Sequence, residues 1–218
     1  MVIAVEAHRI AYMALPKAGC SSVKAALARL DPAVTLPPES EIDLMTWHAV
    51  YPTARFRPHR WKQFGPDWWR FCVVRDPARR LMSCYTDRVV DKRDLHNSRK
   101  LRRGRIDLPR DPDPDFFFRN LRAYAEASSS IKHHCLGAWL FLGPKPLAYD
   151  RIYKTEELGR LAADLSDRTG QPVAMPRENR SSLALRLDDL APATRDALRP
   201  FLAREYAYLS EFYENPLS

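Results

Sequence analysis

The sequence predicts one α/β domain with a central parallel sheet flanked by helices. Two segments support this prediction, because each is a short apolar run that ends at a turn and is followed by an amphipathic helix. Residues 10–15 precede a helix from about 22 to 30, and residues 70–75 precede a helix that extends to about 90. Strands that alternate with helices favour parallel pairing. The 218 residues fit a single domain covering 1–218.

Capping residues indicate where the two helices begin. Ser21 or Ser22 can cap the first helix through its side-chain oxygen. In the second helix, Pro77 fits the first helical position and Asp76 fits the cap. The apolar faces consist of Val23, Ala26, Leu27 and Leu30 in the first helix, and of Leu81, Cys84, Tyr85 and Val89 in the second.

The remaining chain predicts further helices, one more strand and two irregular stretches. Residues 31–69 are rich in Pro, Trp and His without a sustained period, which indicates irregular chain with short helical pieces. Residues 91–115 are charged and end in prolines, which is typical of a mobile insertion near a site rather than of a domain boundary. The other expected elements are helices at 115–127 and 131–142, a strand at 147–153, a helix at 155–169 capped by Thr155, and helices at 188–198 and 200–213.

Positive charge is concentrated in one part of the chain. The net charge is +8, yet residues 55–105 alone contain 16 Lys or Arg against five Asp, a balance of +11. Such a block attracts an anion, which could be a nucleotide, a sulfated or acidic glycan, a nucleic acid or an acidic lipid headgroup. A solvated basic surface without a ligand is the alternative interpretation.

Targeting and metal-binding signals are lacking in the sequence. Residues 1–9 have neither the basic start nor the apolar centre of a secretory signal, and no apolar run approaches the ~20 residues of a membrane span. The four cysteines form no CxxC pair and no zinc-type spacing with His. We therefore expect a cytoplasmic protein with reduced thiols, no metal, and Cys72 in the core.

The loop after residues 10–15 has the features of an anion site. It contains Pro16, Lys17, Ala18, Gly19, Cys20, Ser21 and Ser22. Small residues allow backbone N–H groups to approach a phosphate, and the helix N-terminus adds its positive dipole end. The glycine-rich GxxxxGK[ST] pattern of ATP and GTP kinases is absent, which disfavours those enzymes. An ordinary turn with an exposed Lys17 remains the structural alternative.

A second loop follows residues 70–75 and carries Arg75. Ligands of open α/β sheets bind at the carboxyl edge of the strands, where Arg75 and the nearby Ser83 could hold a second phosphate. Arg75 could instead be a structural partner of Asp76 or of a neighbouring loop.

Together the two loops resemble the donor motifs of the PAPS-dependent sulfotransferases, where PAPS is 3′-phosphoadenosine-5′-phosphosulfate. Residues 12–24 (YMALPKAGCSSVK) look like the 5′-phosphosulfate loop, and residues 71–85 (FCVVRDPARRLMSCY) look like the 3′-phosphate motif. The likeness is strongest to the carbohydrate branch with the chondroitin 4-O, HNK-1 and uronyl 2-O enzymes, and it extends over about 10–213. His134, residues 149–158, and Asn179 with Ser181 are weaker matches.

The resemblance implies a P-loop-like three-layer fold and a reaction without metal. A hydroxyl attacks the donor's sulfur in line, and PAP, the adenosine bisphosphate, leaves. Lys17 would stabilise the leaving oxygen, residues 18–22 would hold the 5′ group, and Arg75 with Ser83 would hold the 3′-phosphate. His48, which lies between the two motifs as the catalytic His does in related carbohydrate enzymes, is the expected general base, and His134 is the second candidate.

Two other functions stay open at this stage. A nucleotide-dependent phosphotransferase could use a similar loop and would require magnesium. A non-catalytic nucleic-acid or polyanion binding protein could combine the basic block with exposed aromatics, and the candidates are Trp47, Trp61, Trp68 and Trp69. Our expectation is a bacterial cytoplasmic enzyme that sulfates a sugar precursor or small glycan. The stretches 31–69 and 91–130, which match the family poorly, are expected to select the acceptor.

Overall fold

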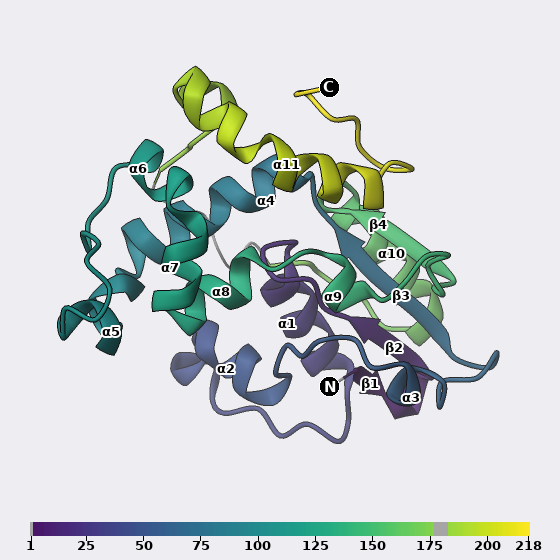
Figure 1. The fold of residues 1–218 in the computed structure, drawn as a ribbon. Coiled ribbons are helices and arrows are strands. Elements are labelled where there is room, and N and C mark those ends of the chain that lie inside the picture. Colours follow the sequence, from purple (N-terminus) through teal and green to yellow (C-terminus); the bar gives the residue numbers. More distant parts are fainter. Residues whose placement is uncertain (1, 177–182) are drawn as a thin grey trace. The chain divides into compact units, whose positions relative to one another are not determined.

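The computed structural model describes residues 2–176 and 183–218 of the chain (Figure 1). Contacts within the chain divide it into two units. The first unit contains the chain up to Arg75 and the segment that starts at Ala138, and the second contains Asp76–Gly137 and the C-terminal segment. Each unit has its own cluster of buried apolar side chains. A single sulfotransferase domain over 1–218 stays a prediction.

The first unit is built on a four-stranded sheet in the order β1-β2-β3-β4 (Figure 1). The strands are β1 (Ile3–Val5), β2 (Ile10–Met13), β3 (Trp69–Val74) and β4 (Arg151–Lys154). β2, β3 and β4 run parallel, and β1 pairs antiparallel with β2. The prediction of an α/β fold with a central, mostly parallel sheet flanked by helices is confirmed. The antiparallel edge strand β1 was not predicted, because three residues are too few for a recognisable pattern.

Helices α1 (Cys20–Leu30) and α10 (Leu158–Thr169) share one apolar cluster with the sheet. Tyr12, Phe71 and Tyr153, one from each parallel strand, are fully buried in it. The rings of Tyr12 and Phe71 stack with centroids 4.9 Å apart. The first unit also contains α2 (Leu44–Val50), α3 (Pro58–Trp61), α9 (Trp139–Leu142) and the 3₁₀ turns η1 (Glu6–His8), η2 (Glu39–Glu41) and η5 (Thr155–Glu157).

The second unit is helical, and its first helix begins as predicted. Pro77 opens α4 (Pro77–Cys84), and the Asp76 side chain accepts a hydrogen bond of 2.8 Å from the Arg79 N–H. The helix continues as a π-helical segment, η3 (Tyr85–Asp91). The other elements are η4 (Asp94–Asn97), α5 (Arg99–Arg102), α6 (Pro114–Arg119), α7 (Leu121–Ala127), α8 (Ser129–Cys135), η6 (Leu187–Asp189) and α11 (Pro192–Tyr208).

Several predicted helix boundaries were wrong. The expected helix 115–127 is interrupted at Asn120, and the expected helix 131–142 ends at Cys135 because Leu136 is extended. The two predicted C-terminal helices are one helix, α11, which contains Pro200. Buried Leu198 and Leu202 hold the chain on both sides of that proline, so packing outweighs its local preference.

Three further segments differ from the prediction. The strand expected at 147–153 is confined to β4, where residues pair with β3. Thr155 starts the turn η5 instead of capping the following helix, whose cap position is Glu157. Residues 91–115 contain η4 and α5 and bury Leu95 and Leu101.

Helix length and thiol burial bear on two earlier expectations. Among the residues that the structure describes, no helix combines the length and apolar character needed to cross a membrane. All four cysteines are buried and carry free thiols, and Cys72 lies fully buried in β3, which confirms it as a core residue.

A buried ion pair connects two helices of the second unit. The guanidinium of Arg80 in α4, which is 1% exposed, donates a 2.9 Å hydrogen bond to the Glu205 carboxylate in α11. It also donates to the backbone carbonyls of Leu136 at 2.8 Å and His134 at 3.3 Å. The carboxylate balances the charge of this buried guanidinium, and both of its terminal nitrogens donate, although Nε is buried without a hydrogen-bond partner.

We predict that Arg80→Met lowers the free energy of unfolding by about 3–5 kcal/mol, because the Glu205 carboxylate stays buried without its counter-charge. Urea denaturation followed by circular dichroism measures the loss. The matched control, exposed Arg102→Met, should change stability by no more than about 0.5 kcal/mol. An equal effect of the two substitutions would contradict the prediction.

Candidate functional site

The turn from β2 to α1 contains two left-handed residues, Lys17 and Gly19, which lie on either side of Ala18. Lys17 has φ 66° and Gly19 has φ 71°, and the Ala18 N–H donates to the Leu15 carbonyl at 3.2 Å. A lysine in the left-handed region costs about 1–2 kcal/mol relative to ordinary backbone, so the surrounding contacts must impose it. A Cβ on Gly19 would lie 3.3 Å from the Leu158 side chain, which also favours glycine there.

Helix α1 begins without a capping side chain. Gly19 is its cap residue, no side chain accepts a hydrogen bond from the first turn, and the first turn contains no acidic residue. The predicted cap by Ser21 or Ser22 was therefore wrong, because the cap position is Gly19, two or three residues earlier. The first N–H groups of a helix have no intrahelical acceptor and form the positive end of its dipole. This terminus thus has the polarity required for a phosphate or sulfate group.

Arg75 contacts the same turn. It follows the last residue of β3, and its Nη1 donates a 2.9 Å hydrogen bond to the Lys17 carbonyl. The parallel strands β2 and β3 end at the same edge of the sheet, which brings these two predicted residues together. Arg75 thus contacts a neighbouring loop, as the structural alternative for this residue predicted. Asp76 caps α4 and accepts a hydrogen bond of 2.7 Å from the Tyr206 hydroxyl.

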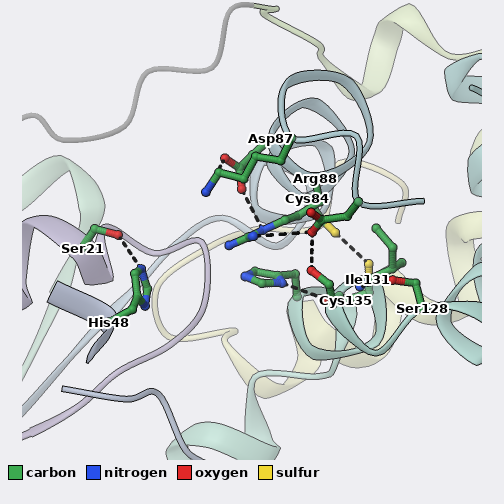
Figure 2. A network of polar contacts seen from close by, with 12 residues as sticks. Ser21, His48, Cys84, Asp87, Arg88, Ser128, Ile131 and Cys135 are labelled. Atoms are coloured by element: carbon green, nitrogen blue, oxygen red, sulfur yellow. Dashed lines mark hydrogen bonds and ion pairs between the residues drawn. The ribbon is translucent and has the colours of Figure 1, made fainter. Parts of the chain in front are cut away.

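His48 lies against the first two turns of α1. Its Nε2 is 3.2 Å from Ser21 Oγ, and its Nδ1 is 3.1 Å from Lys24 Nζ. Figure 2 shows the Ser21 hydroxyl facing the ring of His48. Helix α2 presents this histidine and is itself capped by Asp43, whose carboxylate accepts from the Thr46 N–H at 2.8 Å. The structure therefore brings His48 to the predicted anion loop.

Lys24 was not predicted as a site residue. Its side chain is fully buried, and its ammonium donates to Thr53 Oγ1 at 2.7 Å as well as contacting His48. Burial lowers the pKa of Lys24 below its ordinary value, although the nearby Cys20 thiol opposes this shift. The spacing of three residues from Ser21 places both side chains on the same side of a helix, but it does not indicate that Lys24 is buried.

Two predicted site residues belong to the second unit. Ser83 is half-buried on α4. His134 lies on α8, where its Nδ1 is 2.8 Å from the Ser130 carbonyl. Because a carbonyl only accepts, Nδ1 carries the proton and Nε2 is the bare nitrogen in the neutral ring. Cys135, next in the chain, has its sulfur 3.1 Å from that of Cys84 (Figure 2).

The predicted residues are thus distributed as follows. The first unit holds Pro16, Lys17, Ala18, Gly19, Cys20, Ser21, Ser22, His48 and Arg75, and the second holds Ser83 and His134. Asn179 and Ser181 lie outside the described residues. Within the first unit, the loop, the start of α1, His48 and Arg75 are connected by the hydrogen bonds given above. Lys24 and Thr53, which contact His48 or one another, were not predicted from the sequence.

Comparison with known proteins gave a match to a protein family and a similar solved structure. The sequence model of the Sulfotransferase family matches residues 1–202, which includes parts of both units. A search of curated proteins gave no match. The crystal structure of a sulfotransferase from Alicyclobacillus acidocaldarius is similar at 16% sequence identity over 93% of this chain and 85% of that one, with a TM-score of 0.27. A similarity at that TM-score adds no argument. The family match covers most of the chain and contains both donor-like loops, and the chain therefore belongs to the sulfotransferase family.

Proposed function

We propose that this protein transfers a sulfuryl group from PAPS to a hydroxyl of a carbohydrate acceptor. The observation that carries the proposal is the uncapped N-terminus of α1 behind a turn that holds Lys17 in the left-handed conformation, with Arg75 bound to the carbonyl of Lys17. Membership of the sulfotransferase family supports sulfuryl transfer as the reaction. The nucleotide donor and the carbohydrate acceptor are inferred from the motif resemblance.

In the proposed reaction, the acceptor oxygen forms a bond to sulfur while the bond from sulfur to the bridging phosphate oxygen breaks. The leaving PAP retains that oxygen and its electron pair, and the acceptor's proton passes to a general base. Backbone N–H groups of residues 18–22 and the hydroxyls of Ser21 and Ser22 would bind the 5′ group. Lys17 would neutralise the charge that develops on the leaving oxygen, since such fixed cations lower the barrier most where charge appears.

Binding of the nucleotide's 3′-phosphate is assigned to Arg75 and Ser83, with Asn179 and Ser181 as further candidates. Arg75 is planar, permanently charged and suited to a phosphate. Its Nη1 donates to the Lys17 carbonyl, which places the guanidinium next to the proposed donor loop. In this proposal protein cations take the place of a metal ion.

His48 is our proposed general base, because its ring contacts Ser21 at the start of α1. A base must lie within hydrogen-bond reach of the proton that it removes. His134 remains the second candidate, since its Nδ1–H donates to a carbonyl and leaves Nε2 as the accepting nitrogen. The two histidines can be separated by substitution.

The polyanion-binding alternative is weakened by the positions of the tryptophans. Trp47 is fully buried and Trp61 is 5% exposed, so neither ring offers a face on which a base could stack. Trp68 and Trp69 are half-buried, and Trp69 packs against Phe71 with ring centroids 4.8 Å apart. Trp47 and Trp69 belong to the apolar cluster of the first unit. The phosphotransferase alternative predicts a requirement for magnesium and for ATP or GTP.

We predict that Arg75→Ala weakens PAP binding about 10- to 100-fold, as expected for loss of a charged hydrogen bond to phosphate. Calorimetric titration in EDTA measures the affinity. Adenosine 5′-monophosphate, which lacks the 3′-phosphate, is the matched control ligand and should lose little affinity. Equal weakening of both nucleotides would show that Arg75 acts only by holding the Lys17 turn.

Lys17→Ala is expected to lower kcat about 10²- to 10³-fold while changing PAP affinity much less, because its charge is needed mainly when the leaving oxygen becomes negative. Transfer of ³⁵S from labelled PAPS to a panel of sugars measures the rate. A loss of PAP affinity as large as the loss of kcat would contradict this role.

His48→Ala is expected to lower kcat about 10²- to 10⁴-fold in the same transfer reaction, as for loss of a general base. The matched control is His134→Ala, which should leave kcat within about tenfold. The reverse order of the two effects would assign the base to His134 and exclude His48.

A further inference from the structure

Lys24 is an unusual charge to find in the interior of the first unit. Its side chain is fully buried, and its ammonium contacts a ring nitrogen of His48 and the hydroxyl of Thr53. Among the described residues, no carboxylate lies within ion-pair distance of it. A buried ammonium that contacts only neutral acceptors is poorly compensated, so its proton is held less firmly than that of a surface lysine. Lys24 therefore loses its proton more readily than an exposed lysine does.

The hydrogen bonds impose a direction on the protons of His48. An ammonium can only donate, so protonated Lys24 requires a bare Nδ1 on His48. In the neutral ring the proton then resides on Nε2, which points at Ser21 Oγ. In this state Nε2 donates to the serine and cannot accept a proton from an acceptor hydroxyl.

We propose that Lys24 is a positioning residue that selects the tautomer of His48: as an ammonium it holds the Nε2–H form, and as a neutral amine it allows the Nδ1–H form with a bare Nε2. This inference rests on the proposed function only where it concerns catalysis. The tautomer itself is a property of the protein without any ligand.

The change between the two states is balanced by the loss of one proton. The Nε2 proton leaves to solvent, one Lys24 proton moves to Nδ1, and the amine lone pair of Lys24 then accepts the new Nδ1–H bond. Thr53 Oγ1 accepts a remaining amine hydrogen in both states. His48 is consequently ready to act as a base only after Lys24 has lost its charge.

Other charged and titratable groups near α2 are few and mostly engaged. Arg29 of α1 stacks on the Trp47 ring at 4.7 Å and pairs with Glu39 at 3.3 Å. Those that face α2 or Lys24 from the neighbouring elements are Cys20, Arg29, Asp31, Glu39, Asp43 and Tyr51. Asp31 accepts a hydrogen bond of 2.6 Å from the Tyr51 hydroxyl, and Asp43 caps α2. Lys24 is the group that contacts the His48 ring directly at Nδ1.

The reaction rate should rise with pH as Lys24 loses its proton. Because burial lowers the pKa of Lys24 below its ordinary value, the amine forms as pH rises through that lowered pKa. The population with a bare Nε2 increases over the same pH range. We therefore expect kcat to rise on the alkaline side in step with the change of tautomer.

Nuclear magnetic resonance of the protein with ¹⁵N-labelled histidine tests the inference directly. Long-range ¹H–¹⁵N spectra distinguish the protonated from the bare ring nitrogen, and His48→Gln identifies the His48 signals. At neutral pH we expect Nε2–H and a bare Nδ1 in the wild type, with exchange of the two patterns on raising the pH. A wild type that shows Nδ1–H at neutral pH would overturn the proposal, and this result needs no variant.

Lys24→Met adds a second readout, because the thioether is similar in length and cannot donate to Nδ1. We expect His48 of this variant to lose its fixed Nε2–H pattern, and the alkaline rise of kcat to disappear. Thr53→Val, which leaves the Lys24 contact to His48 in place, is the matched control and should keep the pattern. An unchanged pattern in Lys24→Met would also overturn the proposal. PAP binding by the wild type is measured separately, so a failure to bind PAP contradicts the proposed function alone.

Discussion

The backbone turn between β2 and α1 is the constraint on which the candidate site depends. Left-handed conformations at Lys17 and Gly19 turn the chain, so that α1 begins at Cys20, a few residues after the end of β2. That start leaves the first N–H groups without a side-chain cap, and the Lys17 carbonyl accepts a hydrogen bond from Arg75. A helix that began at a serine cap would use the same N–H groups internally. The turn therefore leaves the first N–H groups of α1 without a side-chain cap, which is what our proposed phosphate site requires.

The two buried cations Arg80 and Lys24 differ in the groups that compensate their charge. Arg80 has a carboxylate partner, Glu205, and two backbone carbonyls, so its charge is held in one state and stabilises the helix packing of the second unit. Lys24 has a ring nitrogen and the Thr53 hydroxyl as its partners. Its charge is compensated less, and its proton can be shared with His48. The first arrangement is suited to stability, and the second is suited to control of proton position.

The sheet could largely be predicted from the sequence, because β2 and β3 are apolar runs that end at clear turns and Asp76–Pro77 is a strong helix start. Asn120 and Leu136 interrupt the helices predicted there, and the apolar pattern of the sequence did not indicate either break. Residue types and motif order led us to propose the β2–α1 loop and His48 as site residues, and the structure places His48 next to Ser21. Lys24 could not be predicted, because a lysine on a helix normally faces water and only the fold shows that α2 covers it.

The most direct test of the central claim compares two ligands on the unmodified protein. Calorimetric titration with PAP in EDTA should show binding at micromolar concentration with a stoichiometry of one. ATP with magnesium should show no comparable binding. This result would support the β2–α1 turn as a site for a 3′,5′-bisphosphorylated nucleotide. Binding of ATP with magnesium together with no binding of PAP would contradict the account and support a phosphotransferase instead.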